Sequence, residues 1–157
     1  KDLTVFVLDK PRHRGLVEEI HQAGARVTLY PAGDVAGAIM AAIPDTEVDV
    51  LMGTGGTPEG IISACAIRAM GGEFQGRINP QLATEIVSVR NAGFDTERWY
   101  ERDELIGSDD VHFCATGITS GLLFRGVKLT KHHFKTETLI VTGASKEQVS
   151  LTNWHNR

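Results

Sequence analysis

Residues 48–60 have the sequence VDVLMGTGGTPEG, and this stretch decides the fold. Residues 48–52, which are apolar apart from Asp49, predict a strand. The glycine-rich residues 53–56 predict a loop, after which Thr57 is expected to cap a helix with Pro58 in its first turn. A strand that leads through a glycine-rich loop into a helix is typical of an α/β protein with parallel strands.

The same alternation precedes this stretch. Apolar, β-branched runs predict strands at residues 3–8 and 25–30. Apolar residues at helical spacing predict helices at residues 16–23 and 34–43. With the helix expected from Thr57 to about residue 70, the order is β-α-β-α-β-α. This order predicts a parallel sheet with right-handed crossovers.

The pattern beyond residue 80 is less regular. Helices are expected at residues 81–91 and 95–105. Strands are expected at residues 111–114, 126–129, 138–141 and 148–152. We therefore expect one α/β domain over residues 1–157. Its first part is expected to be three-layered around a mostly parallel sheet, and its end to hold antiparallel strands.

Composition excludes several classes of protein. The 157 residues are 41% hydrophobic and 23% charged, which is ordinary for a globular domain and not for a disordered chain or a coiled coil. A net charge of −4 argues against a nucleic-acid binder. Apolar runs are too short to span a membrane, and no secretory signal is visible. Cys65 and Cys114 lie in apolar runs and are expected to be buried thiols in a reducing cytoplasm.

Ligands of open α/β sheets lie beyond the carboxyl ends of the strands. These ends are expected to present Lys10 and Arg12, Gly33 and Asp34, and two longer loops at residues 53–60 and 116–119. Because such loops leave one edge of the sheet, we expect them to converge.

Each candidate also has a simpler interpretation. The Lys10-Pro11-Arg12 turn suits a phosphate, but a solvated basic turn is the alternative. Asp34 is a helix cap or a partner for a sugar hydroxyl. Glu59 is favoured by the helix dipole or is one ligand of a hard divalent cation. His13, beside Arg12, could touch a phosphate, but it is expected at the surface.

Four motifs in one order resemble the class II fructose-1,6-bisphosphatases. They are VLDKPRH at residues 7–13, GDVAGAI at residues 33–39, GGTPEG at residues 55–60 and CATGIT at residues 114–119. The resemblance implies the fold of the lithium-sensitive sugar phosphatases. It also implies a hydrolase that uses Mn²⁺ or Mg²⁺ to remove the 1-phosphate of fructose 1,6-bisphosphate, giving fructose 6-phosphate. Some members also hydrolyse sedoheptulose 1,7-bisphosphate.

The resemblance assigns roles to seven residues. The implied substrate-binding residues are Lys10, Pro11, Arg12, Gly33, Asp34 and Gly56, and the implied metal ligand is Glu59. The sequence departs from the family pattern at several positions, and two of them are Ala32, which replaces the first Asp of an acidic D-G-D loop, and Ser120, which replaces an Asp. These departures bear on which substrate is bound, such as another sugar or an inositol phosphate.

The family's other carboxylate ligands, in a D-P-x-[DE]-G-T motif, have no counterpart in the sequence. The resemblance therefore maps the chain onto the carboxy-terminal half of a two-domain phosphatase. The chain starts at Lys1 without an initiator Met, which we take as a sign of a longer protein. The resemblance also implies that the missing amino-terminal half is a partner of this chain and that the complete protein is a cytoplasmic homo-oligomer. It implies no catalytic residue and no activity in this chain alone. A non-catalytic phosphate-binding module is the alternative.

Overall fold

The computed structural model describes residues 2–157 and begins with a parallel sheet. Its strands are β1 (Thr4–Leu8), β2 (Arg26–Tyr30) and β3 (Val50–Leu51), in the order β2-β1-β3. The helices that follow them are α1 (Arg14–Gln22), preceded by the 3-10 turn η1 (Pro11–His13), α2 (Asp34–Ala42) and α3 (Thr57–Met70). The predicted alternation of strands and helices is confirmed, with β3 shorter than residues 48–52.

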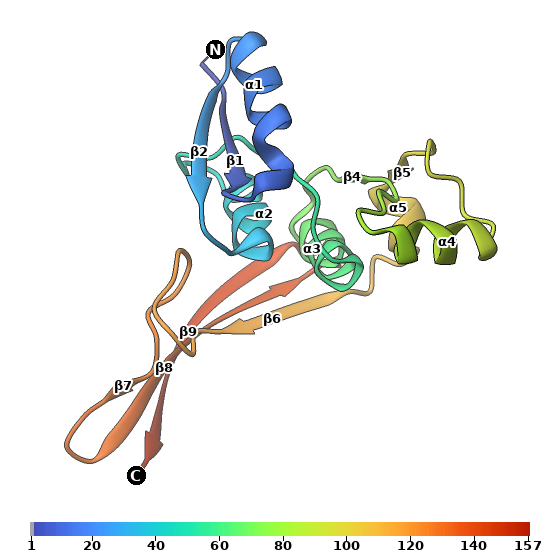
Figure 1. Ribbon diagram of the computed structural model, residues 1–157. Coiled ribbons are helices and arrows are strands. Elements are labelled where there is room, and N and C mark those ends of the chain that lie inside the picture. Colours follow the sequence, from blue (N-terminus) through green and yellow to red (C-terminus); the bar gives the residue numbers. More distant parts are fainter. Residues whose placement is uncertain (1) are drawn as a thin grey trace.

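The alternating side chains of β1 cover both faces of this sheet. Val5 and Val7 pack with Ile20 of α1, whereas Phe6 and Leu8 pack with residues that include Met40 of α2. The two helices therefore lie on opposite faces of the sheet (Figure 1). This follows from right-handed crossovers, because β2 and β3 flank β1 on opposite sides.

A second sheet adds a fourth layer to the three that were expected. It contains β6 (His112–Thr116), β7 (Lys128–Leu129), β8 (His133–Thr142) and β9 (Glu147–Asn156), all antiparallel. A buried cluster joins α2 and α3 to this sheet; its members are Ile39, Ala66, Ala69, Phe113, Leu139 and Val141. Strand β6 thus belongs to the antiparallel sheet.

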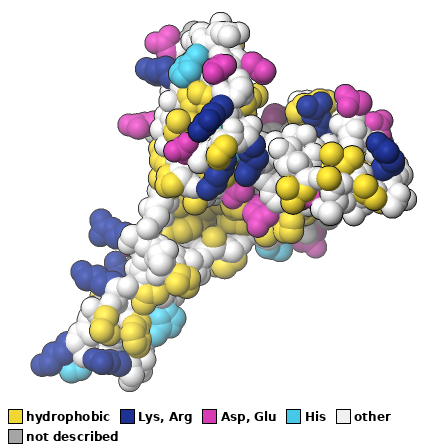
Figure 2. Space-filling view, viewed as in Figure 1, with side chains coloured by type: hydrophobic (Ala, Val, Ile, Leu, Met, Phe, Trp, Pro, Cys, Tyr) yellow, Lys and Arg dark blue, Asp and Glu magenta, His cyan; other side chains and the backbone are white. Residues whose placement is uncertain are grey.

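The long hairpin of β8 and β9 extends away from the parallel sheet, and the C-terminus lies at its far end (Figure 1). Residues 111–157 contain six Lys and Arg but only two Asp and Glu, in contrast to the acidic chain as a whole. Figure 2 shows Lys and Arg side chains gathered along this extended end. In residues 2–157 we find no helix whose length and apolar character would suit a bilayer.

The segment between α3 and β6 agrees with its prediction at residues 81–91, where a helix was expected, and differs from it further on. It forms α4 (Ala83–Asn91), a two-stranded sheet of β4 (Gln75–Gly76) and β5 (Tyr100–Glu101), and the short α5 (Arg102–Leu105). The predicted helix at residues 95–105 is therefore wrong over most of its length. Tyr100 and Glu101 instead pair with Gly76 and Gln75, so backbone pairing with a distant segment replaces local helix formation.

The predicted burial of the two cysteines is also wrong. Cys65 on α3 is only half-buried, and Cys114 on β6 is exposed. Successive side chains of β6 point to opposite faces, and Phe113 takes the inner one. On α3, Ile61 and Ile62 are 41% and 48% exposed. The buried face of that helix consists of one isoleucine and four small residues, namely Ile67, Ser63, Ala64, Ala66 and Ala69.

Candidate functional site

The carboxyl ends of β1 and β3 form the point where the chain changes direction across the sheet. The segment after β1 leads to α1 on one face, whereas the segment after β3 leads to α3, which packs beside α2 on the other face. Loops that diverge in this way leave a space outside the strand ends, where ligands of open α/β sheets bind. The predicted phosphate-binding turn and the glycine-rich loop both lie here.

Arg12 connects these two loops directly. Its Nε donates a hydrogen bond of 2.8 Å to the backbone carbonyl of Thr54. This contact uses one N–H at the edge of the exposed guanidinium, and no ion pair to Arg12 occurs within residues 2–157. Pro11 begins the 3-10 turn after Lys10, which is half-buried. The expectation that the Lys10–Arg12 turn meets the glycine-rich loop is confirmed.

His13 is not a surface residue, so that prediction is wrong. The side chain is 3% exposed, and its Nδ1 lies 2.8 Å from the carbonyl of Leu8 at the end of β1. The backbone N–H of Thr54 points at Nε2 at 2.9 Å. Since a carbonyl can only accept, Nδ1 carries the proton and Nε2 is the acceptor. His13 therefore holds both strand ends together.

Two carboxylates approach the adjacent glycines of the loop. A Cβ placed on Gly56 would lie 2.1 Å from Oε2 of Glu59, and one on Gly55 would lie 2.9 Å from Oδ2 of Asp34. Glu59 is in the first turn of α3, so its carboxylate folds back over the start of its own helix. The cap of this helix is Gly56 and not the predicted Thr57. Side chains of α2 and α3 thus converge on one short piece of backbone.

Gly33 and Asp34 shape the entry to α2. Gly33 is the cap, with a left-handed φ of 104° that favours glycine. Asp34 is the first helical residue and not the cap, and its Oδ1 accepts a 3.0 Å hydrogen bond from the N–H of Val35. Its other oxygen, Oδ2, faces Gly55.

The residues present do not complete a divalent cation site. Within the described part of the chain, no group of three or more His, Cys, Asp or Glu side chains is placed to hold a metal ion. Asp34 and Glu59 supply carboxylates beside Gly55 and Gly56. Magnesium is usually held by one or two carboxylates together with substrate phosphates and water. Further donors would therefore have to come from outside this set.

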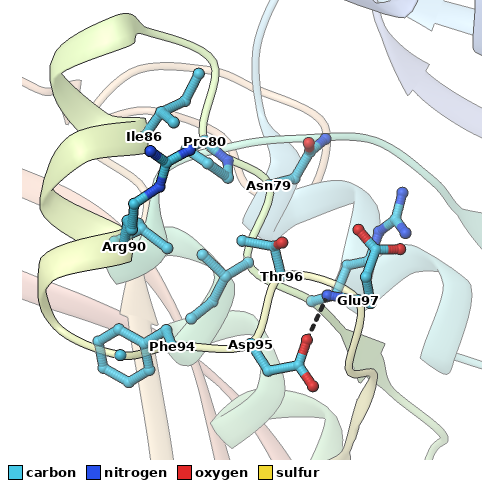
Figure 3. A pocket seen from close by; sticks show the side chains of 12 residues that line it. Asn79, Pro80, Ile86, Arg90, Phe94, Asp95, Thr96 and Glu97 are labelled. Carbon is cyan, nitrogen blue, oxygen red and sulfur yellow. Dashed lines mark hydrogen bonds between the residues drawn. The ribbon is translucent and has the colours of Figure 1, made fainter.

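Asn79 is a site residue that the sequence analysis missed. Its Nδ2 donates a 3.1 Å hydrogen bond to Oγ1 of Thr54, from a segment 25 residues away. Asn79 also lines a cavity of about 540 Å³ between α4 and residues 93–97 (Figure 3). No local motif marks Asn79, because its role depends on a tertiary contact.

The loop at residues 116–119 does not leave the parallel sheet, contrary to the expectation, because it follows β6 of the antiparallel sheet. It continues into a tight turn in which Gly121 N–H donates to the carbonyl of Phe124 at 3.0 Å. Leu122 in this turn lies near Gly33, since a Cβ there would be 3.7 Å from Leu122 Cδ1. The loop thus borders the start of α2.

An ion-pair network anchors α5 to α3. Arg68 pairs with Asp103 and, at 2.8 Å, with Asp109, while Arg102 pairs with Asp103 at 2.6 Å. The hydrogen bond from Arg102 lowers the pKa of the Asp103 carboxyl below its ordinary value of 3.8. These contacts hold α5 and the residues that follow it against α3.

A glycine-rich loop held by a cationic turn at the ends of parallel strands is typical of α/β proteins that bind anionic ligands. Comparison with known proteins identifies the family within this class. Residues 1–155 match the family described as bacterial fructose-1,6-bisphosphatase, glpX-encoded. The chain therefore belongs to this family.

Individual relatives agree with this assignment. The chain is 40% identical to the fructose-1,6-bisphosphatase class 2 of Haemophilus influenzae, over 98% of this chain and 50% of that protein. It is also 40% identical to the D-fructose 1,6-bisphosphatase class 2/sedoheptulose 1,7-bisphosphatase of Synechococcus elongatus, over 92% of this chain and 46% of that protein. The chain spans about half the length of these curated relatives.

Proposed function

We propose that this chain is the carboxy-terminal, substrate-binding half of a divalent-metal-dependent fructose-1,6-bisphosphatase. The complete protein would hydrolyse the 1-phosphate and release fructose 6-phosphate and phosphate. The observation that carries the proposal is the convergence of Arg12, Asp34 and Glu59 on residues 54–56. Family membership supports the same reaction, and the superfamily of lithium-sensitive sugar phosphatases is part of the proposal.

In this proposal the cationic and anionic side chains bind different parts of the substrate. Lys10 and Arg12 bind a phosphate group of the sugar, because a guanidinium presents a planar pair of donors to phosphate oxygens. Asp34 Oδ2 accepts a hydrogen bond from a sugar hydroxyl. Gly55 and Gly56 leave room for the two carboxylates, since any side chain there would meet one of them. In this proposal the backbone at Gly56 also touches the substrate.

Glu59 gives a physical reason for a metal. Its carboxylate covers the start of α3, where the helix dipole would otherwise attract a phosphate. A phosphate and a carboxylate repel each other at this position unless a cation lies between them. Mn²⁺ or Mg²⁺, when bound, would neutralise charge on the phosphoryl oxygens. Glu59 is one ligand in this proposal, and the other ligands come from the half of the family's length that this chain does not match.

The proposal is tested by reconstitution. This chain is joined to the half of the Haemophilus influenzae relative that it does not match, and phosphate release from fructose 1,6-bisphosphate is measured with Mn²⁺. We expect turnover from the joined polypeptide and none from the 157-residue chain, which should only bind the sugar bisphosphate weakly. Turnover by the chain alone, or a folded joined polypeptide that is inactive beside the active parent enzyme, would contradict the proposal.

Sedoheptulose 1,7-bisphosphate is a second candidate substrate, because it is named for the Synechococcus relative. Its hydrolysis by the joined polypeptide is measured in parallel. A preference for an inositol phosphate in the same panel would reassign the substrate.

A further inference from the structure

We propose that His13 is a positioning residue that sets the backbone of Thr54 and thereby the geometry of the ligand loop. The expected effect on ligand binding rests on the proposed function, whereas the expected effect on the backbone of Thr54 does not. His13 contacts no carboxylate or other side chain that would give it a charge partner; its polar contacts within residues 2–157 are to backbone atoms of Leu8 and Thr54.

The two ring nitrogens perform separate tasks. Nδ1 donates to the carbonyl of Leu8, so the ring is fixed to the last residue of β1. Nε2 accepts the N–H of Thr54, so the ring is also fixed to the loop that follows β3. An imidazole with Nδ1 protonated satisfies both partners at once. No other neutral side chain has a donor and an acceptor at this separation on a rigid ring.

Neighbouring contacts complete the constraint on Thr54. Arg12 Nε holds the carbonyl of Thr54, and Asn79 Nδ2 holds its hydroxyl. With the N–H held by His13, all three polar groups of Thr54 are engaged by other segments. Thr54 is therefore the fixed point from which Gly55 and Gly56 extend towards the ligand.

Gly53 explains why the loop accepts the buried ring. It has a φ of 158°, and a Cβ at this position would lie 3.1 Å from Cε1 and 3.3 Å from Nε2 of His13. The backbone thus passes directly over the edge of the imidazole. The close approach of Gly53 and the hydrogen bond to Thr54 fix the course of the loop on both sides of one peptide unit.

Two substitutions separate the tasks of the ring. In His13→Gln, the side-chain amide oxygen reaches the position of Nε2 and can still accept from Thr54. In His13→Asn, the amide reaches only the position of Nδ1, so the bond to Leu8 is kept and the bond to Thr54 is lost. Both remove a buried ring, so both should lower the melting temperature by a similar amount.

The experiment measures the exchange rate of the Thr54 amide proton by NMR and the binding of fructose 1,6-bisphosphate to this 157-residue chain. In His13→Asn we expect faster exchange at Thr54 and affinity weakened by about tenfold, as for the loss of one neutral hydrogen bond that positions the ligand loop. In His13→Gln both values should stay close to those of the unsubstituted chain.

Two results would overturn the inference. One is a Thr54 amide that exchanges equally slowly in His13→Asn and in the unsubstituted chain. The other is equal loss of affinity in both variants, which would assign His13 to stability alone. If the unsubstituted chain binds no sugar bisphosphate, the proposed function fails, while the exchange rate of Thr54 still decides the role of His13.

Discussion

Replacing Gly56 with Ala should displace the Glu59 carboxylate without disturbing the fold. Gly56 has φ and ψ of −68° and 148°, which alanine adopts without strain. Its new Cβ would lie 2.1 Å from Glu59 Oε2, whereas ordinary contact begins at 3.4 Å. The carboxylate must therefore move by about 1.3 Å, and a shift of that size costs roughly a hundredfold in a positioned site.

Gly56→Ala should lower the free energy of unfolding only slightly. The atom that must move is the end of a flexible side chain, and alanine in place of a cap residue costs about 1 kcal/mol. A domain of this kind is stable by about 5–15 kcal/mol, so Gly56→Ala remains folded. The expected signature is lost function with a nearly unchanged melting temperature.

Gly60 provides the matched control. It lies one turn further along α3, and a Cβ there meets no atom within 4 Å. Gly60→Ala should stabilise the helix by roughly 1 kcal/mol and leave activity unchanged. The assay compares the Mn²⁺ dependence of phosphate release by the joined polypeptide carrying either substitution. Equal activity in the two variants would refute the placement of Glu59 in the reaction.

Further predictions concern binding, acid stability and thiol exposure. Arg12→Ala should weaken binding of fructose 1,6-bisphosphate by roughly tenfold to a hundredfold, as for loss of a charged hydrogen bond of about 1.5–3 kcal/mol, and an unchanged affinity in a calorimetric titration would make the turn purely structural. The pKa of Asp103 is lowered by Arg102 in the folded state, so the stabilisation is present above about pH 3.8 and is lost as the pH falls below this value. Unfolding by urea between pH 7 and pH 3 should therefore show a steeper acid loss in the unsubstituted chain than in Asp103→Asn, and identical pH profiles would argue against the pair. Exposed Cys114 should react with a thiol reagent in the native chain before half-buried Cys65, and Cys114→Ser should remove the fast phase; a fast phase that persists would contradict the orientation of β6.

Local patterns in the sequence predicted much of the first 70 residues. The apolar run of β1, the helical spacing of apolar residues in α2 and Pro58 in the first turn of α3 are local signals, because strand and helix patterns act over a few residues. The same order of strands and helices was enough to bring the Arg12 turn and the glycine-rich loop together. The family resemblance was visible in the same loops.

Only the tertiary structure decided which side chains are buried and what they contact. His13 is an ordinary polar residue of a turn in the sequence, yet it is buried between two strand ends because β1 and β3 are neighbours. Asn79 reaches Thr54 from 25 residues away, and Tyr100 joins a strand where the local pattern favours a helix. These outcomes depend on contacts between distant segments, whose free energy outweighs local propensity and leaves no periodic signal in the sequence.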